Sequence, residues 1–140
     1  MRSSVPAAPV SSEIRSASLA PNLVVTWLTG YITRDLAERK LVLFRELLTD
    51  CVNPIWIMEV SQITGFDPRA LSVGGEWWAY FKSKQVGRGQ ISLISPARAG
   101  RMAGACLSFS AGVDVKSFTT LAECFEALGI ALPTDHLNIG

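Results

Sequence analysis

The stretch from Asn53 to Trp78, NPIWIMEVSQITGFDPRALSVGGEWW, decides which fold the rest of the sequence can adopt. Ile55 to Val60 is an apolar run with β-branched and aromatic members. Such a run predicts a strand that is buried on both faces, as in a parallel sheet covered by helices. Ser61 to Phe66 is then expected to be a loop that leads into a helix.

The start of this helix carries two local signals. The Asp67 carboxylate can accept hydrogen bonds from backbone N–H groups of the first turn, and Pro68 fits the first helical position, where no N–H is needed. We expect the helix to run from Pro68 to Lys82 or Lys84. A buried strand that feeds a helix N-terminus is where α/β sheets usually place their binding surface. The alternative is a β-loop-α unit that serves only the core.

Two further features of this helix point to a contact. Gly74 and Gly75 each cost about 1 kcal/mol relative to Ala in a helix interior, which suggests close packing against another backbone or an interrupted helix. The aromatic side chains of the helix are Trp77, Trp78, Tyr80 and Phe81. Helix neighbours differ by about 100°, so some of these rings are expected to point away from the sheet. They would then form a contact surface, unless the N-terminal leader or the C-terminal tail covers them.

Strand and helix patterns alternate along the rest of the chain. The expected strands cover residues 13–18, 23–28, 55–60, 90–95 and 113–118. The expected helices cover residues 34–49, 68 to 82 or 84, 97–110 and 120–128, with Thr33 and Thr120 as N-caps and Gly129 as a C-cap. The order β-β-α-β-α-β-α-β-α predicts an α/β fold: a mixed, mostly parallel sheet with helices packed on it.

Length and composition limit the classes of function. The chain has 140 residues, 49% of them hydrophobic, and a formal net charge of +1. We expect a flexible leader at residues 1–12, one domain at residues 13–130 and a tail at residues 131–140. Near-neutral charge argues against a nucleic-acid or anionic-membrane partner. The mean hydropathy of +0.28 is high, yet no run approaches the ~18 to 20 apolar residues of a membrane span, which favours a contact with a partner or self-association.

The cysteines and the histidine do not form a recognisable site. Cys51, Cys106 and Cys124 have no CxxC spacing and no nearby His. We expect them to be small buried hydrophobes in a reducing cytoplasm, with a reactive Cys51 as the alternative. The one histidine, His136, lies in the tail, which argues against a nucleophile–histidine pair.

Other catalytic patterns are also missing. The sequence contains neither GxGxxG nor GxxxxGK[ST], so no phosphate-binding loop is predicted. Asp67 could be imagined as paired with Glu59 or Glu76, but Asp67 is better explained as a helix cap and Glu59 as a partly exposed strand residue. We therefore expect no catalytic residue, no metal site and no cofactor.

The element order and the stretch IMEVSQITGFDPRAL resemble the STAS domain, the fold of bacterial anti-sigma factor antagonists such as SpoIIAA. In that family the third strand leads into the pattern D-x-S-x-V-x-x-x-D-S-S-G-L. The matching positions here are Val60-Ser61, Ile63, Phe66-Asp67 and Leu71. The resemblance extends over roughly residues 13–129, because the later strands and helices also resemble the second half of the family.

One departure from the family concerns its switch. The family's switch is the second Ser of the D-S-S pattern, which a partner kinase phosphorylates, and Pro68 and Arg69 stand at those positions here. A phosphate would add nearly two negative charges at a helix N-terminus, and Arg69 cannot do this. Ser61, Thr64 and Ser72 lie nearby in the sequence, but none occupies the matching position. The resemblance thus implies a module without the usual phospho-switch, in which Arg69 could attract an acidic partner.

The leading hypothesis is a non-enzymatic cytoplasmic module of bacterial regulation or scaffolding. Its partner would be another protein (a regulator, a kinase-like protein or a scaffold component) or a second copy in a dimer, with no nucleic acid and no membrane span. The expected partner-binding residues are Ser61, Thr64, Asp67, Arg69, Ser72, Trp77, Trp78 and Phe81. The alternative is a small-molecule or lipid carrier whose aromatic residues line a pocket.

Overall fold

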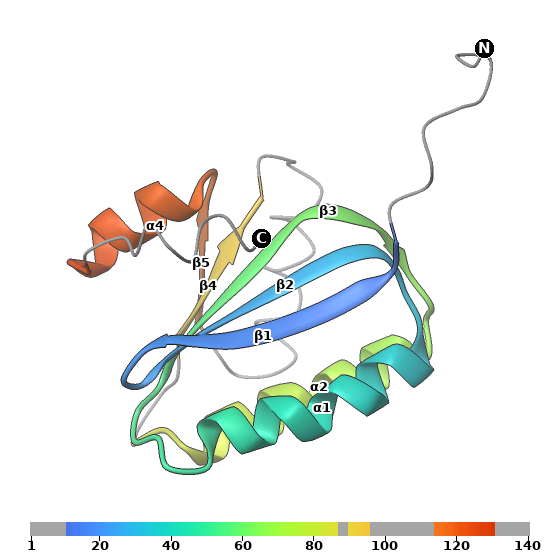
Figure 1. Cartoon of the computed structure of the whole chain (residues 1–140), viewed down its shortest axis with the longest axis horizontal. Helices are drawn as coiled ribbons and strands as arrows, with labels where there is room; N and C mark the ends of the chain where they lie inside the picture. The colour runs from blue at the N-terminus through green and yellow to red at the C-terminus, as the bar shows by residue number, and fades with distance from the viewer. Residues whose placement is uncertain (1–10, 87–89, 96–113, 131–140) are drawn as a thin grey trace.

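A twisted five-stranded sheet carries the fold (Figure 1). The computed structural model describes residues 11–86, 90–95 and 114–130. Its strands, in sheet order, are β1 (Glu13–Ala20), β2 (Leu23–Ile32), β3 (Ile55–Phe66), β4 (Gln90–Ile94) and β5 (Asp114–Phe118). The β1–β2 pair is antiparallel and the other three pairs are parallel. The prediction of an α/β fold with a mixed, mostly parallel sheet is confirmed.

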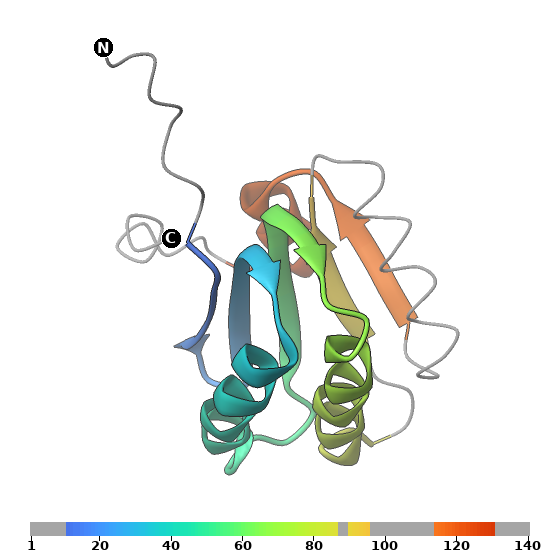
Figure 2. The same cartoon turned by 90° about the vertical axis from the view of Figure 1, so that its right-hand side faces the viewer.

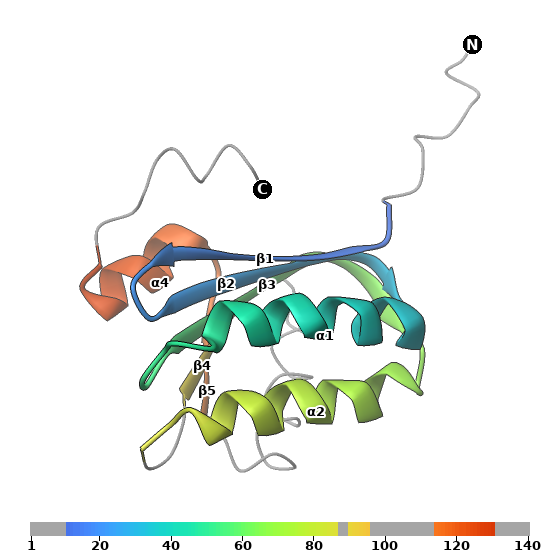
Figure 3. The same ribbon diagram turned by 60° about the horizontal axis from the view of Figure 1, so that its bottom comes forward.

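Helices lie on both faces of this sheet. α1 (Arg34–Leu48) and α2 (Ala70–Ser83) lie side by side on one face, and α4 (Leu121–Leu128) lies on the other (Figures 2 and 3). Each face has its own apolar core, because alternate residues of the strands point to opposite sides. Within the described ranges, no helix is long and apolar enough to cross a membrane. The helix predicted at residues 97–110 lies outside those ranges, as do most of the leader and all of the tail.

The caps of α1 and α4 were correctly predicted from the sequence. Thr33 Oγ1 accepts the backbone N–H of Leu36 at 3.2 Å, and Thr120 Oγ1 accepts the backbone N–H of Glu123 at 3.1 Å. Gly129 ends α4 in the left-handed conformation. These three signals are local, so the sequence around them suffices to place them.

The predicted loop at residues Ser61–Phe66 is wrong, because β3 continues to Phe66. β2 is also longer than expected, and its last residues pair with this segment: Gly30 with Ile63 and Ile32 with Phe66. Side chains in the segment alternate between half-buried and exposed, as in a strand with one covered face. The strand is stabilised by a neighbour that is distant in sequence, so its local composition, with few apolar residues, was misleading.

The expectation that α2 would turn some of its large aromatic rings outward is wrong for three of them. Trp77, Trp78 and Phe81 are all buried, at 5%, 6% and 0% exposure, whereas Tyr80 is half-buried. The reason is that α2 packs on two neighbours at once. Trp77 faces α1 and donates its indole N–H to the Ala37 carbonyl at 3.1 Å. The rings of Trp78 and Phe81 lie against Trp56 of β3, on which Trp77 also stacks.

Trp56 is the centre of this core. Its ring centroid lies 4.5 Å from that of Phe44 on α1, and 5.4 Å from those of Trp78 and Phe81 on α2. Its indole N–H is donated to Thr26 Oγ1 on β2 at 2.9 Å, which satisfies a polar group that would otherwise be buried without a partner. One side chain thus connects two strands and two helices.

The cysteines with a described position are free thiols. Cys124 lies buried in the core under α4, and this burial raises the pKa of its thiol. The prediction of a small buried hydrophobe is therefore confirmed for Cys124. Cys51 is half-buried and its Sγ–H donates to the Leu47 carbonyl at 3.5 Å, while Cys106 lies outside the described residues.

Two glycines should respond in opposite directions to the same substitution. Gly30 has a φ of +72°, and a Cβ there would lie 2.9 Å from the Ser12 Cα. We expect Gly30→Ala to lower the free energy of unfolding by about 2 kcal/mol or more. Gly75 lies within the uninterrupted helix α2, and none of the described atoms comes within 4 Å of a Cβ built there. Gly75→Ala should therefore raise the free energy of unfolding by about 0.5–1 kcal/mol.

Urea unfolding followed by tryptophan fluorescence would measure both changes. Equal and small effects at the two positions would contradict the positive φ of Gly30 and its contact with the Ser12 backbone.

Candidate functional site

The last residues of β2 and β3 hold the start of α2 in place. Ile32 pairs with Phe66 at the end of the two strands, and the next backbone N–H, that of Asp67, donates to the Ile32 carbonyl at 2.9 Å. Pro68 and Arg69 then form a turn, which the hydrogen bond from the Ala70 N–H to the Asp67 carbonyl closes at 2.8 Å. The first turn of α2 is therefore fixed to the carboxyl edge of the sheet, where α/β folds commonly bind their ligands.

Asp67 acts as predicted on the backbone, although α2 begins two residues later than expected. The helix starts at Ala70 rather than at Pro68, and Arg69 stands in the N-cap position without a side-chain hydrogen bond to the helix. Asp67 Oδ1 nevertheless accepts the Arg69 backbone N–H at 2.9 Å. The aspartate thus orders the turn before the helix, and Pro68 supplies a restricted φ within that turn.

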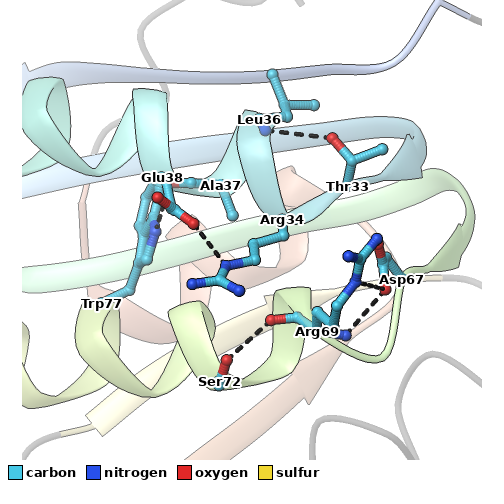
Figure 4. Close-up of polar contacts among 9 residues, drawn as sticks. All are labelled: Thr33, Arg34, Leu36, Ala37, Glu38, Asp67, Arg69, Ser72 and Trp77. Atoms are coloured by element: carbon cyan, nitrogen blue, oxygen red, sulfur yellow. Dashed lines mark hydrogen bonds and ion pairs between the residues drawn. The ribbon is translucent and has the colours of Figure 1, made fainter.

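The same carboxylate also fixes the Arg69 side chain. Asp67 Oδ2 accepts from Arg69 Nη2 at 2.9 Å, and Asp67 Oδ1 accepts from Arg69 Nε at 3.3 Å (Figure 4). The Arg69 side chain is 74% exposed and that of Asp67 only 16%. The hydrogen bond from the Arg69 side chain, with the backbone hydrogen bond next, lowers the pKa of Asp67. The result is an oriented cation that projects into solvent.

Exposed apolar side chains lie at the ends of the elements that meet at this turn. Tyr31 at the end of β2 is 47% exposed, Phe66 at the end of β3 is 38% exposed, and Leu71 in the first turn of α2 is 49% exposed. A Cβ at Gly65 would lie 3.2 Å from the Tyr31 ring, so the absence of a side chain there gives this ring its place. Sequence reasoning missed all three side chains. Their signal was available: each is a large apolar residue at an element end, where a polar residue is usual.

A second arginine lies close to the turn. Arg34, the first residue of α1, is paired with Glu38 and is 54% exposed. Figure 4 shows it on the side of α1 that faces the first turn of α2, and its charge contributes to the low pKa of Asp67. We call this region the β3–α2 surface and define it by Tyr31, Arg34, Phe66, Arg69 and Leu71.

The hydroxyl-bearing candidates have separate positions. Ser72 lies in the first turn of α2 and donates to the Arg69 carbonyl at 2.9 Å, next to the β3–α2 surface (Figure 4). Ser61 lies farther back on β3 and is half-buried. Its hydroxyl donates to Glu59 Oε1 at 2.6 Å, and its backbone N–H donates to the same oxygen at 2.7 Å. Thr64 is exposed on β3.

The structure therefore groups only part of the predicted binding set. Asp67, Arg69 and Ser72 come together at the start of α2. The predicted aromatic members of that set, Trp77, Trp78 and Phe81, do not reach the surface, because they fill the core between α2, α1 and the sheet. Glu59 is half-buried and its carboxylate is used by Ser61, which explains an acidic residue in an apolar strand.

An apolar cavity of about 100 Å³ lies beside α2. Its described lining includes Trp56, Gly74 and Trp78, and its one polar side chain is Thr26, whose hydroxyl already bonds to Trp56 and Ser16. Pockets for drug-sized ligands usually measure about 300–1,000 Å³. This volume does not favour the lipid-carrier alternative. Among the described residues, no group of three or more His, Cys, Asp or Glu side chains could hold a metal ion.

The Asp67–Arg69 pair gives a prediction about pH. The pKa of Asp67 is lowered by folding, so its charge stabilises the native state above the unfolded pKa of about 3.9, and this stabilisation is lost as the pH falls through the folded pKa. Asp67→Asn keeps an acceptor for the Arg69 backbone N–H but removes the charge. We expect the variant to melt below the wild type at about pH 7, and the difference to shrink as the pH falls below the unfolded pKa of about 3.9. A difference in Tm that is independent of pH would contradict a role for the charge.

Comparison with solved structures places this fold. The chain matches a protein of the DUF3478 family from Shewanella loihica PV-4, described as having a SpoIIAA-like fold, with a TM-score of 0.65 and 12% identity over 86% of this chain and 93% of that one. It matches the unphosphorylated anti-sigma factor antagonist SpoIIAA with a TM-score of 0.60 and 14% identity over 82% of this chain and 96% of that one. For the phosphorylated form of Bacillus SpoIIAA the TM-score is 0.58 and the identity 11%, over 82% and 98% of the two chains.

No family model and no curated protein sequence matches the chain. At identities of 11% to 14% these likenesses establish the fold and nothing more. The resemblance to the STAS domain is confirmed at that level: the chain has a SpoIIAA-like, STAS-like fold.

Proposed function

We propose that this chain is a non-enzymatic cytoplasmic module that binds another protein through the β3–α2 surface. One observation carries the proposal: the Arg69 guanidinium is held by a mostly covered carboxylate at the junction of β3 and α2, where three element ends also carry exposed apolar side chains. An arginine beside aromatic and aliphatic groups is the composition typical of energetically dominant protein contacts. The likeness in fold to anti-sigma factor antagonists supports the same class of function.

The fixed geometry of Arg69 should favour tight recognition. Two hydrogen bonds from its side chain to Asp67 hold the guanidinium before any partner arrives, so less side-chain entropy is lost on binding. The guanidinium has further N–H donors that can bond to a carboxylate. The expected partner therefore presents an acidic residue next to an apolar one, which would lie on Tyr31, Phe66 or Leu71.

Binding at this surface is proposed to be independent of phosphorylation at the usual position. SpoIIAA is described in both a phosphorylated and an unphosphorylated form. Pro68 and Arg69 carry no hydroxyl group, so the positions that resemble the family's switch cannot accept a phosphate on oxygen in this chain. The positive charge of Arg69 is permanent, since neighbouring Asp67 raises the pKa of the guanidinium further.

The test uses the full chain as bait for proteins of its native cell. We expect a protein that wild-type bait retains but that Arg69→Glu and Leu71→Ser baits lose, because the first change reverses a charge of the surface and the second removes an apolar contact. Lys82→Glu is the matched control, since it makes the same charge change at an exposed position in the last turn of α2.

The retained protein would then be purified and titrated against each variant. We expect Arg69→Glu to weaken binding about tenfold or more, and added salt to weaken wild-type binding. A partner that binds wild type, Arg69→Glu and Leu71→Ser equally would disprove the β3–α2 surface as the site.

A further inference from the structure

The outward face of α1 carries an apolar pair that is not buried by the described part of the chain. Val42 is 56% exposed and Leu43 is 49% exposed, in the middle of the helix. α1 packs against the sheet and α2 through other residues, chiefly Leu41, Phe44 and Leu48, which are buried. Figure 3 shows α1 with one side against the sheet and another beside α2, and the exposed fractions of Val42 and Leu43 place this pair on a remaining side. On an amphipathic helix such positions are usually polar.

The charges on either side of this pair have opposite signs. Arg39 lies three residues before Val42, and Glu46 lies three residues after Leu43. Residues three and four apart are neighbours on a helix, so the four side chains form one stripe on the exposed face. The stripe is symmetric about the midpoint between Val42 and Leu43, with a cation at one end and an anion at the other.

We propose that this stripe binds a second copy of the chain, with the two α1 helices antiparallel across a two-fold axis. Such an axis brings Val42 and Leu43 against the same residues of the second copy. It also places Arg39 opposite Glu46 of the second copy, and this pair occurs twice. A parallel arrangement would set Arg39 against Arg39 and Glu46 against Glu46, so the charges select the antiparallel one.

The existing ion pair on α1 does not prevent this contact. Arg39 Nε donates to Asp35 Oδ2 at 2.9 Å, and the two side chains are 62% and 81% exposed. Exposed pairs of this kind contribute little to stability, and a guanidinium has donors for a second carboxylate. The stripe is separate from the β3–α2 surface, so the inference does not rest on the proposed function. A dimer formed this way would carry that surface twice.

The contact is small, so we expect a weak dimer with a dissociation constant on the order of 0.1 mM. Sedimentation equilibrium from about 10 µM to about 1 mM spans the transition. The wild type should pass from monomer to dimer over this range, and Leu43→Ser should weaken the dimer about tenfold. A wild type that stays monomeric at about 1 mM would overturn the proposal.

A charge-exchange experiment tests the geometry itself. Arg39→Glu sets two acidic residues against each other in the homodimer, and Glu46→Arg sets two basic ones against each other. Each variant alone should dimerise about tenfold more weakly than wild type. An equimolar mixture of the two should form clearly more dimer than either variant alone, because both contacts across the axis of the mixed dimer join opposite charges.

Two control variants change charge by the same amounts elsewhere. Lys82→Glu and Glu76→Arg lie at exposed positions of α2, and neither should alter the dimer, singly or mixed. Circular dichroism and thermal melting of each variant separate lost association from lost folding. If the two α1 variants dimerise like wild type, or if their mixture shows no recovery, the antiparallel α1 contact is wrong.

Discussion

The position of α2 depends on the indole of Trp56. From β3 this ring contacts Phe44 of α1 together with Trp78 and Phe81 of α2, with centroid distances of 4.5 to 5.4 Å. Aromatic pairs contribute about 0.5–1.5 kcal/mol each beyond the burial of their area. Because the indole N–H is also bonded to Thr26 of β2, rotation of the ring would leave a buried donor unpaired. The Trp56 side chain therefore fixes α1, α2, β2 and β3 relative to one another.

The pairing of β2 with β3 extends from this core to the carboxyl edge of the sheet and fixes the backbone there. Both strands continue to the edge, where Ile32 pairs with Phe66 and then accepts the Asp67 N–H. From there, Asp67 orders both the turn and the Arg69 guanidinium. Strands and helices hold a side chain more accurately than a free loop does. A hydrogen bond from a second residue fixes the side chain further. This explains how a highly exposed arginine can still have a defined direction.

The sequence predicted those features whose causes are local. The alternation of strands and helices, the Thr33 and Thr120 caps, the Gly129 C-cap and the acceptor role of Asp67 follow from a few neighbouring residues each. The strand at 61–66 could not be predicted this way, since its stability comes from pairing with β2 about thirty residues earlier.

The binding side chains were harder to predict than the strands and helices. The sequence of α2 predicts outward aromatic side chains if the helix has only one covered face. In the structure α1 covers a second direction, so neighbouring Trp77 and Trp78 are both buried. The exposed apolar residues instead lie at the ends of three different elements: Tyr31 of β2, Phe66 of β3 and Leu71 of α2. Only the pairing of β2 with β3 shows that these ends meet, and that pairing is not visible in any short window of sequence.

The two proposals together suggest how such a module could be regulated without a phosphate switch. In the proposed contact, Arg69 is a permanent cation at an exposed position. The affinity of one β3–α2 surface for an acidic partner should therefore depend on salt, because exposed charges are screened over about 8 Å at physiological ionic strength. The permanent cation leaves no chemical change at positions 68 and 69 that would turn binding off. Self-association through α1 would supply a different control, since two β3–α2 surfaces on one dimer raise the effective concentration for a partner with two sites. Occupancy of the partner would then follow the concentration of this chain.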